Sequence, residues 1–249
     1  MVHSVRARRR LSGQALPSRV RIVLPILMPD GRPGSSKATW RDLGRARRAA
    51  LSDREQDRRD RGWERTGFRE VRRTGAGTVA LYLSRPGEPA TVGLAARLAG
   101  AGLTVLAPVL TDGAGHGIHD PAWARFDADR LRDGLWGIPE PDGPVLGPDA
   151  LIRADLVICS AIWVDRNGHR VGTGGGWYDR ALAGSGYRSG GGHRLDSGRH
   201  PVAPVWAMVD ESEVVPALPH DRWDIRVDAA LTPSGLLPLA VSEAATPAE

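Results

Sequence analysis

The residues best suited to chemistry lie in one glycine-rich segment, and their types indicate an anion-binding site. Four glycines fall within 172–176, Arg170 precedes them, and Tyr178, Asp179 and Arg180 follow. Glycine has no Cβ, so the backbone can approach a ligand closely, and successive N–H groups beside a helix N-terminus create a positive potential. A cation and a carboxylate on either side of such a loop indicate phosphate groups with a divalent cation, for which carboxylate oxygen is a preferred ligand.

Two familiar nucleotide-binding motifs are excluded at this segment. A P-loop ends in Gly-Lys followed by Ser or Thr, whereas this segment ends in Gly176-Trp177-Tyr178. A dinucleotide-binding fingerprint needs a third small residue where Trp177 stands. A plain flexible linker is the remaining alternative, and the charged and aromatic residues on both sides argue against it.

A second cationic feature lies near the start of the chain. Lys37 is the single lysine among 34 basic residues. Its compact ammonium suits phosphate oxygens, although chance would also explain one lysine in an arginine-rich chain. Lys37 and Arg41 are four positions apart, so in a helix both side chains project from the same face of the first turn.

The elements that must position these residues follow a strand–helix–strand pattern. Ser35 or Ser36 can cap a helix that begins near Lys37, and Ser52 can cap a second helix. Further helices are predicted over 94–101 and 177–183. Apolar runs predict strands over 78–83, 103–109, 123–126, 156–164, 204–209 and 227–231. The order implies parallel pairing with right-handed crossovers, and so a single three-layer α/β domain with a mostly parallel central sheet flanked by helices.

The uneven charge divides the chain into three parts. Residues 1–36 hold seven arginines and one acid and are expected to form a basic, disordered extension. Residues 37–236 form the expected domain, in which 184–201 reads as a flexible loop, and 237–249 form a short C-terminal tail. The basic extension could bind nucleic acid, but it contains no aromatic residue, and the charges of 37–73 alternate in sign as on a solvated helix face. We therefore expect no nucleic-acid partner.

Composition also limits where the chain works. No apolar run approaches the roughly 20 residues needed to cross a bilayer, so no membrane partner is expected. Cys159 is the only cysteine, so an intrachain disulfide is excluded and a reducing compartment, the cytoplasm, is expected. The oligomeric state is not readable from the sequence.

Over 37–234, roughly four-fifths of the chain, the motifs resemble in order those of the 5-formyltetrahydrofolate cyclo-ligase family, also called methenyltetrahydrofolate synthetases. The most specific stretch is 170–180, which reads RVGTGGGWYDR. The other matching motifs are Lys37-x-x-x-Arg41, 79–83 followed by Gly87-Glu88-Pro89, Gly137-Ile138-Pro139-Glu140-Pro141, and Asp224-Ile225-Arg226-Val227-Asp228 leading to Leu231-Thr232-Pro233.

This resemblance implies an ATP- and Mg²⁺-dependent enzyme that converts 5-formyltetrahydrofolate to 5,10-methenyltetrahydrofolate. In such a reaction the formyl oxygen is activated by phosphoryl transfer, and folate N10 then closes the ring and expels phosphate. A non-catalytic relative that binds a nucleotide or folate and acts through a partner is the alternative. It is suggested by Thr173, which stands where many relatives have a basic residue.

The resemblance also implies a role for each matching position. Catalytic roles fall to Lys37, Arg170 and Tyr178. The implied ATP contacts are Lys37, Arg41, Arg170, Val171, Gly172, Thr173, Gly174, Gly175, Gly176, Trp177 and Tyr178. The implied folate contacts are Leu83, Glu88, Trp136 and Tyr178, and the implied magnesium ligands are Asp179 and Asp224. The pair His220-Asp221 is an alternative to Asp224, which is preferred because it keeps the family's distance from Asp228 and Thr232.

Overall fold

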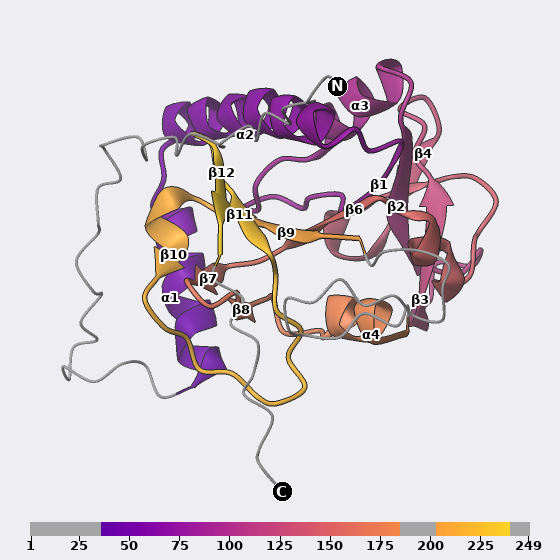
Figure 1. Ribbon diagram of the computed structural model, residues 1–249. Coiled ribbons are helices and arrows are strands. Elements are labelled where there is room, and N and C mark those ends of the chain that lie inside the picture. The colour runs from indigo at the N-terminus through magenta and orange to yellow at the C-terminus, as the bar shows by residue number, and fades with distance from the viewer. Residues whose placement is uncertain (1–35, 185–202, 240–249) are drawn as a thin grey trace, which may run out of the picture.

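The computed structural model describes residues 36–184 and 203–239 and contains a seven-stranded central sheet (Figure 1). The inner strand pairs are parallel, and an antiparallel strand closes each edge. Except for Ser36 and Gly184, the expected extension 1–36 and the loop 184–201 lie outside the described residues. In spatial order the strands are β12 (Leu236–Pro238), β11 (Ala229–Leu231), β9 (Val205–Met208), β6 (Leu156–Ser160), β1 (Thr78–Leu81), β2 (Thr104–Thr111) and β3 (Gly117–Arg125).

Helices cover both faces of this sheet, which confirms the three-layer α/β architecture. In Figure 1, α2 (Asp53–Thr74) and α3 (Val92–Gly100) lie along one face, and α4 (Trp177–Gly184) lies on the other. The first helix, α1 (Lys37–Ala49), lies beside a small second sheet. That sheet contains β10 (Val214–Val215), β7 (Trp163–Asp165) and β8 (Arg170–Val171) in this order.

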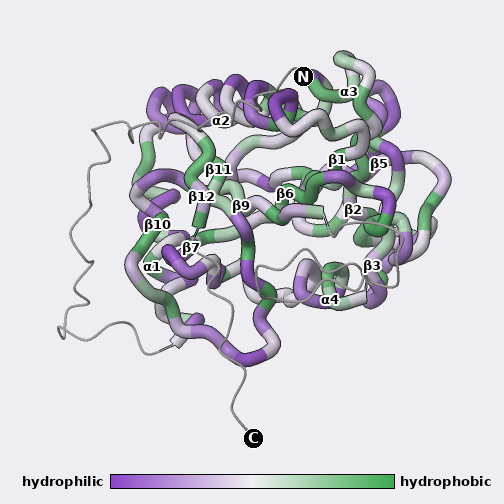
Figure 2. The backbone as a smooth tube through the Cα atoms, viewed as in Figure 1, coloured by the Kyte–Doolittle hydropathy of each residue, from purple (hydrophilic) through white to green (hydrophobic). Residues whose placement is uncertain are grey.

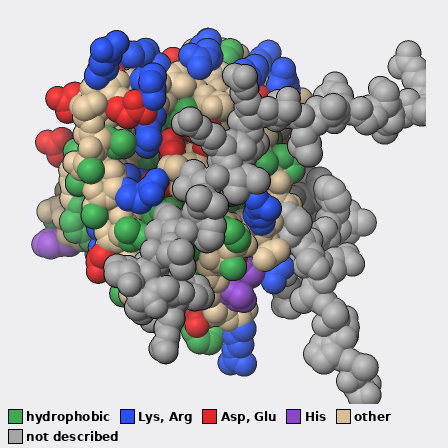
Figure 3. All heavy atoms as spheres, turned by 90° about the vertical axis from the view of Figure 1, so that its left-hand side faces the viewer, with side chains coloured by type: hydrophobic (Ala, Val, Ile, Leu, Met, Phe, Trp, Pro, Cys, Tyr) green, Lys and Arg blue, Asp and Glu red, His purple; other side chains and the backbone are tan. Residues whose placement is uncertain are grey.

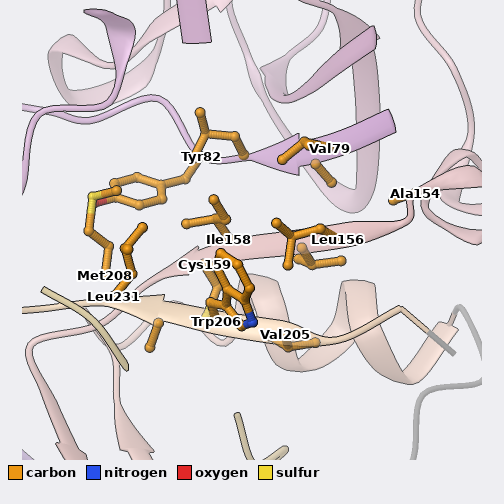
Figure 4. Packing of buried hydrophobic residues seen from close by; sticks show 14 of the residues in the cluster. Val79, Tyr82, Ala154, Leu156, Ile158, Cys159, Val205, Trp206, Met208 and Leu231 are labelled. Carbon is orange, nitrogen blue, oxygen red and sulfur yellow. The ribbon is translucent and has the colours of Figure 1, made fainter. Parts of the chain in front are cut away.

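The core explains why the central strands are almost continuously apolar. Strands buried on both faces cannot alternate between apolar and polar residues. Val79, Ile158 and Met208, from β1, β6 and β9, are each fully buried (Figure 4). The hydropathy of the chain shows the same division, with apolar strands inside and a strongly polar α2 outside (Figure 2).

The capping predictions for the first two helices are confirmed. The side chain of Ser36 accepts a hydrogen bond from the backbone N–H of Thr39 at 3.2 Å, and Ser52 accepts one from that of Glu55 at 3.3 Å. The expected solvated face of mixed charge lies on α2, where basic and acidic side chains adjoin in the upper part of Figure 3. Arg58, for example, is exposed and pairs with Glu55 at 2.6 Å.

Several predicted boundaries differ from the structure by a few residues, and one predicted strand is divided. The apolar run 156–164 is not one strand: β6 ends at Ser160, and β7 begins at Trp163 in the second sheet. Hydrophobicity could not reveal the break, because Trp163 is buried against α1 and donates to the carbonyl of Trp40 at 2.7 Å. The predicted strand 123–126 belongs to the longer β3, whose first residues are largely exposed and polar, and β12 continues past the expected domain boundary at 236.

A hairpin lies beside the central sheet. Its strands β4 (Leu131–Asp133) and β5 (Pro139–Pro141) pair antiparallel, and a short 3-10 turn, Leu135–Gly137, joins them. Two further 3-10 turns are Pro148–Arg153 and Glu211–Glu213. Residues at the tip of this hairpin line the same cavity as Leu83 and Ser160, which lie at the carboxyl ends of β1 and β6.

Candidate active site

A cavity of about 690 Å³ lies at the carboxyl ends of the central strands. The chain runs from β1 to β2 on one side and later returns to β6 on the other, so β1 and β6 flank a topological switch point. Ligands in open α/β sheets bind in the crevice at such a point. Leu83 and Ser160, which follow or end these two strands, line the cavity together with side chains of α1, the glycine-rich segment and the β4–β5 hairpin.

The glycine-rich segment connects β8 to α4 and forms one wall of the cavity. Gly174 and Gly176 have φ angles of 114° and 62°, which a side chain would disfavour. Several of its carbonyl groups are held by arginines. Arg41 Nε donates to the carbonyl of Gly172 at 3.0 Å, and Arg180 Nη1 donates to that of Gly175 at 2.9 Å.

Lys37 enters the cavity from the first turn of α1 and is held by two carboxylates. Its Nζ lies 2.7 Å from Asp221 and 2.5 Å from Asp224. Burial alone would lower the pKa of Lys37, but hydrogen bonds with both aspartates outweigh it and raise the pKa above the ordinary value of 10.5. The ammonium is therefore fixed and charged before any ligand enters.

Arg170 and Asp179 form a second charged pair across the glycine-rich segment. Arg170 Nη2 lies 2.7 Å from Asp179 Oδ1, and Arg170 is only 8% exposed. The Nε of Arg170 is buried and has no hydrogen-bond partner in the described part of the chain. A buried donor without a partner is costly, so an acceptor from a ligand would stabilise it.

Aromatic and carboxylate groups line the remaining walls. Trp136 is 71% exposed and adopts the left-handed region with φ 59°, so its indole is not part of the core but stands at the cavity wall on the tip of the hairpin. Glu88 is not a solvated turn residue, because its side chain is only 10% exposed and pairs with Arg85 at 3.3 Å. Burial raises the pKa of Tyr178 well above 10, so its phenol stays protonated and can donate a hydrogen bond.

The structure gathers nearly all the site residues expected from sequence. Every one of them lines the cavity except Val171, whose side chain packs in a small cluster with Trp40 and Trp163. Arg180, which follows the glycine-rich segment, lines the cavity too. The structure also adds lining residues that the sequence did not single out, among them Arg45, Arg85, Ser160 and Trp223. Of these, only Arg45 carried a signal, because it continues the four-residue spacing of Lys37 and Arg41.

The charges of the cavity suit a polyanion. Three acidic side chains line it, Glu88, Asp179 and Asp224. Six basic side chains line it, namely Lys37, Arg41, Arg45, Arg85, Arg170 and Arg180. Such an excess of positive charge in a concave site attracts phosphate groups.

The carboxylates also fit a magnesium ion that arrives with phosphates. Within the described ranges, no three His, Cys, Asp or Glu side chains gather as a metal-binding cluster. Mg²⁺ at a nucleotide site needs only one or two protein carboxylates besides phosphates and water. Asp179 and Asp224 both line the cavity and supply that donor set.

Comparisons with known proteins agree on one family. A family model described as the 5-formyltetrahydrofolate cyclo-ligase family matches residues 33–233. The chain is 31% identical over 157 residues to a 5-formyltetrahydrofolate cyclo-ligase of Mycolicibacterium smegmatis, covering 63% of this chain and 73% of that protein. It is 32% identical over 163 residues to the protein of the same name from Escherichia coli K12, covering 64% and 79%.

Solved structures show the same fold. The NMR structure of Aquifex aeolicus 5,10-methenyltetrahydrofolate synthetase superimposes with a TM-score of 0.62 at 21% identity, covering 86% of this chain and 96% of that one. A 5,10-methenyltetrahydrofolate synthetase from Mycoplasma pneumoniae gives 0.55 at 15% identity, covering 80% and 99%. At these identities the likeness concerns the fold alone.

Proposed function

The chain belongs to the 5-formyltetrahydrofolate cyclo-ligase family, and from this premise we propose that it converts 5-formyltetrahydrofolate to 5,10-methenyltetrahydrofolate with the consumption of ATP. The observation that carries this proposal is that Lys37, Arg170 and the glycine-rich segment line the same cavity. The same space adjoins Glu88 and Trp136, so a nucleotide and a second ligand can meet there.

The triphosphate site is the glycine-rich segment together with α1. Backbone amides and the cations Lys37, Arg41 and Arg170 offer donors to phosphate oxygens, as anion sites at helix N-termini do. Lys37 can share its three ammonium hydrogens between its two aspartates and a phosphate. Its fixed position means that little is lost in ordering it when ATP binds.

The folate site is the opposite part of the cavity. Leu83 and Trp136 supply apolar and aromatic surface on which a pterin ring can stack. Glu88 can accept hydrogen bonds from the pterin's donor edge. The low exposure of Glu88 would make such a charge-assisted bond stronger than in water.

The chemistry proceeds in two balanced steps. The formyl oxygen attacks the γ-phosphorus of ATP, so an O–P bond forms as the bond to ADP breaks, which leaves an activated imidate. N10 then attacks the formyl carbon, loses its proton and closes the five-membered ring, while the C–O bond breaks and phosphate leaves with the former formyl oxygen. The products are ADP, phosphate and the methenyl cation.

The residues of this chain act in these steps by binding and orientation. Lys37 and Arg170 neutralise charge on the transferring phosphoryl group, because phosphoryl transfer depends on positioning and electrostatics more than on a protein nucleophile. The protonated phenol of Tyr178, whose O–H points to the Ile158 carbonyl at 3.5 Å, would turn this hydrogen bond to the ligands where they meet. Asp179 and Asp224 would hold a magnesium ion, which supplies further charge neutralisation on the phosphates when bound.

A spectrophotometric assay tests the function directly. We expect absorbance of the methenyl product to rise only when 5-formyltetrahydrofolate, ATP and Mg²⁺ are all present, and omission of any one should stop it. The variant Lys37→Ala should lower kcat/KM by roughly 10² or more while the protein stays folded. Calorimetric binding of ATP or folate without any product would instead favour a non-catalytic relative.

The cellular site is part of the same proposal. In the described residues no helix is long and apolar enough to cross a membrane. The one cysteine, Cys159, is buried and unpaired, as in proteins of reducing compartments. We infer that the protein works in the cytoplasm.

A further inference from the structure

A third cation on α1 reaches the glycine-rich segment. Lys37, Arg41 and Arg45 are spaced four residues apart and therefore form one stripe along the helix. All three line the cavity. The first two belong to a motif that marks nucleotide contacts, whereas Arg45 lies outside it.

Arg45 and Arg41 hold two consecutive carbonyl groups of the segment. Arg45 Nη2 donates to the carbonyl of Thr173 at 3.0 Å, next to the bond from Arg41 to the carbonyl of Gly172. Arg180 holds the carbonyl of Gly175 from α4. In these bonds the guanidinium groups neutralise the partial negative charge of the carbonyl oxygens. A carbonyl oxygen without such a partner would repel a phosphate, so the bonds favour phosphate binding at the segment.

The other contact of Arg45 is too weak to explain its position. Its Nη1 lies 3.4 Å from Asp42, whose side chain is 78% exposed. Exposed ion pairs of this kind contribute little free energy. The bond to Thr173 is shorter and links Arg45 to a residue 128 positions away, so the geometry favours a role at the segment.

Thr173 brings no charge of its own to the segment. A guanidinium carries five N–H donors in a fixed fork, so Arg45 can hold the Thr173 carbonyl with one arm and offer others to a phosphate. Its side chain is 52% exposed, which leaves that part of the fork accessible.

We propose that Arg45 is a further polyphosphate-binding residue, which fixes the peptide at Thr173 and adds a positive charge beside it. The proposal rests on the assignment of the glycine-rich segment as the ATP phosphate site. Arg45 acts on the nucleotide and not on folate, because it lies on the α1 side of the cavity, where Arg41 and the segment meet.

The test compares Arg45→Ala with Arg54→Ala, a matched loss of one arginine charge on the exposed first turn of α2. Calorimetry with inorganic tripolyphosphate should show about tenfold weaker binding for R45A and no change for R54A. In the coupled assay, R45A should raise the KM for ATP about tenfold and leave the KM for 5-formyltetrahydrofolate unchanged. The variant Arg45→Lys should restore only part of the affinity, because an ammonium lacks the fork.

The outcomes separate this inference from the proposed function. Tripolyphosphate binding by R45A within twofold of the unaltered protein would overturn the role of Arg45, even if the protein makes methenyltetrahydrofolate. An equal loss in R45A and R54A would also overturn it, because the effect would then be one of net charge. If binding depends on Arg45 but no methenyl product forms, the inference stands and the proposed function fails.

Discussion

At the scale of single residues, the two aspartates that hold Lys37 differ in their surroundings. The Asp224 side chain is 13% exposed and also accepts the backbone N–H of Asp221 at 2.7 Å, whereas the Asp221 side chain is 49% exposed. Both contact the ammonium, so the sequence alternative between them is not an exclusive choice. Of the two aspartates, Asp224 is the more buried and accepts an additional hydrogen bond from the backbone.

We therefore expect Asp224→Asn to impair the enzyme more than Asp221→Asn. Loss of the buried charge should lower kcat/KM by roughly tenfold or more, because Lys37 and a bound magnesium ion both lose a partner. The exposed Asp221 should matter by less than about threefold, since exposed pairs contribute little. Steady-state assays of each variant at varied Mg²⁺ and ATP concentrations measure kcat/KM. An equal decrease for the two variants would contradict the prediction that Asp224 matters more than Asp221.

Cys159 predicts a pH dependence of stability. Burial raises the pKa of its thiol to about 11, against an ordinary value of 9.0. Between these pH values the unfolded chain loses the thiol proton and the folded chain keeps it, so the free energy of unfolding falls as pH rises. The loss is about 1 kcal/mol by pH 10 and about 2 kcal/mol by pH 11, and it approaches about 3 kcal/mol only above pH 11.

Urea unfolding at pH 8, 9 and 10 checks this, with Cys159→Ala as the comparison. The variant should lose less stability over this interval than the unaltered protein. Tyr82 and Tyr178 contribute in both proteins, and because burial is the main cause that raises their pKa values, with Cys159 a lesser one, most of their contribution cancels. If the free energy of unfolding falls equally with pH in the two proteins, the Cys159 thiol does not titrate as described.

At the scale of elements, α1 must approach the second sheet closely to deliver its cations. A Cβ at Gly44 would lie 2.1 Å from Ile162 Cγ2 and 2.7 Å from Trp163 Nε1. The buried pair Arg48–Glu213, at 2.7 Å, fixes the same helix. The position of Lys37 thus depends on packing made elsewhere on α1.

Gly44→Ala should therefore disturb both stability and nucleotide binding. Overpacking of this kind costs about 1–3 kcal/mol, and displacement of α1 should raise the KM for ATP. Gly100→Ala in α3 is the control, because a Cβ there meets nothing within 4 Å and the substitution should be neutral or stabilise by up to about 1 kcal/mol. Thermal unfolding measures the Tm of both variants. G44A should have a lower Tm than the unaltered protein, and G100A an equal or higher one. Equal decreases in both variants would contradict the close approach of α1 to the second sheet.

Local signals predicted the helices and most strands, but not the elements defined by distant contacts. The caps Ser36 and Ser52 act within one turn, so sequence reveals them. Glu140 shows the opposite case: it is fully buried and accepts from Thr111 Oγ1 at 2.7 Å and from Arg132 at 3.1 Å. Those bonds tie the hairpin that carries Trp136 to β2, and no local pattern announces them.

At the scale of the whole molecule, the fold explains why residues far apart in sequence share one cavity. Parallel strands place their carboxyl ends along one edge, so Leu83 and Ser160 meet there. The predicted strand–helix–strand order was enough to indicate that edge. It could not show how α1 or Arg45 would lie against the glycine-rich segment, because that depends on contacts more than 100 residues apart.

The central claim is that the formyl oxygen is phosphorylated before the ring closes, and isotope transfer tests it most directly. The substrate is 5-formyltetrahydrofolate labelled with ¹⁸O in the formyl group, and the inorganic phosphate formed with ATP and Mg²⁺ is analysed by mass spectrometry. We predict one ¹⁸O atom in each phosphate released per methenyl product. Unlabelled phosphate, with the label released to water, would contradict phosphoryl activation and the role we give to this cavity.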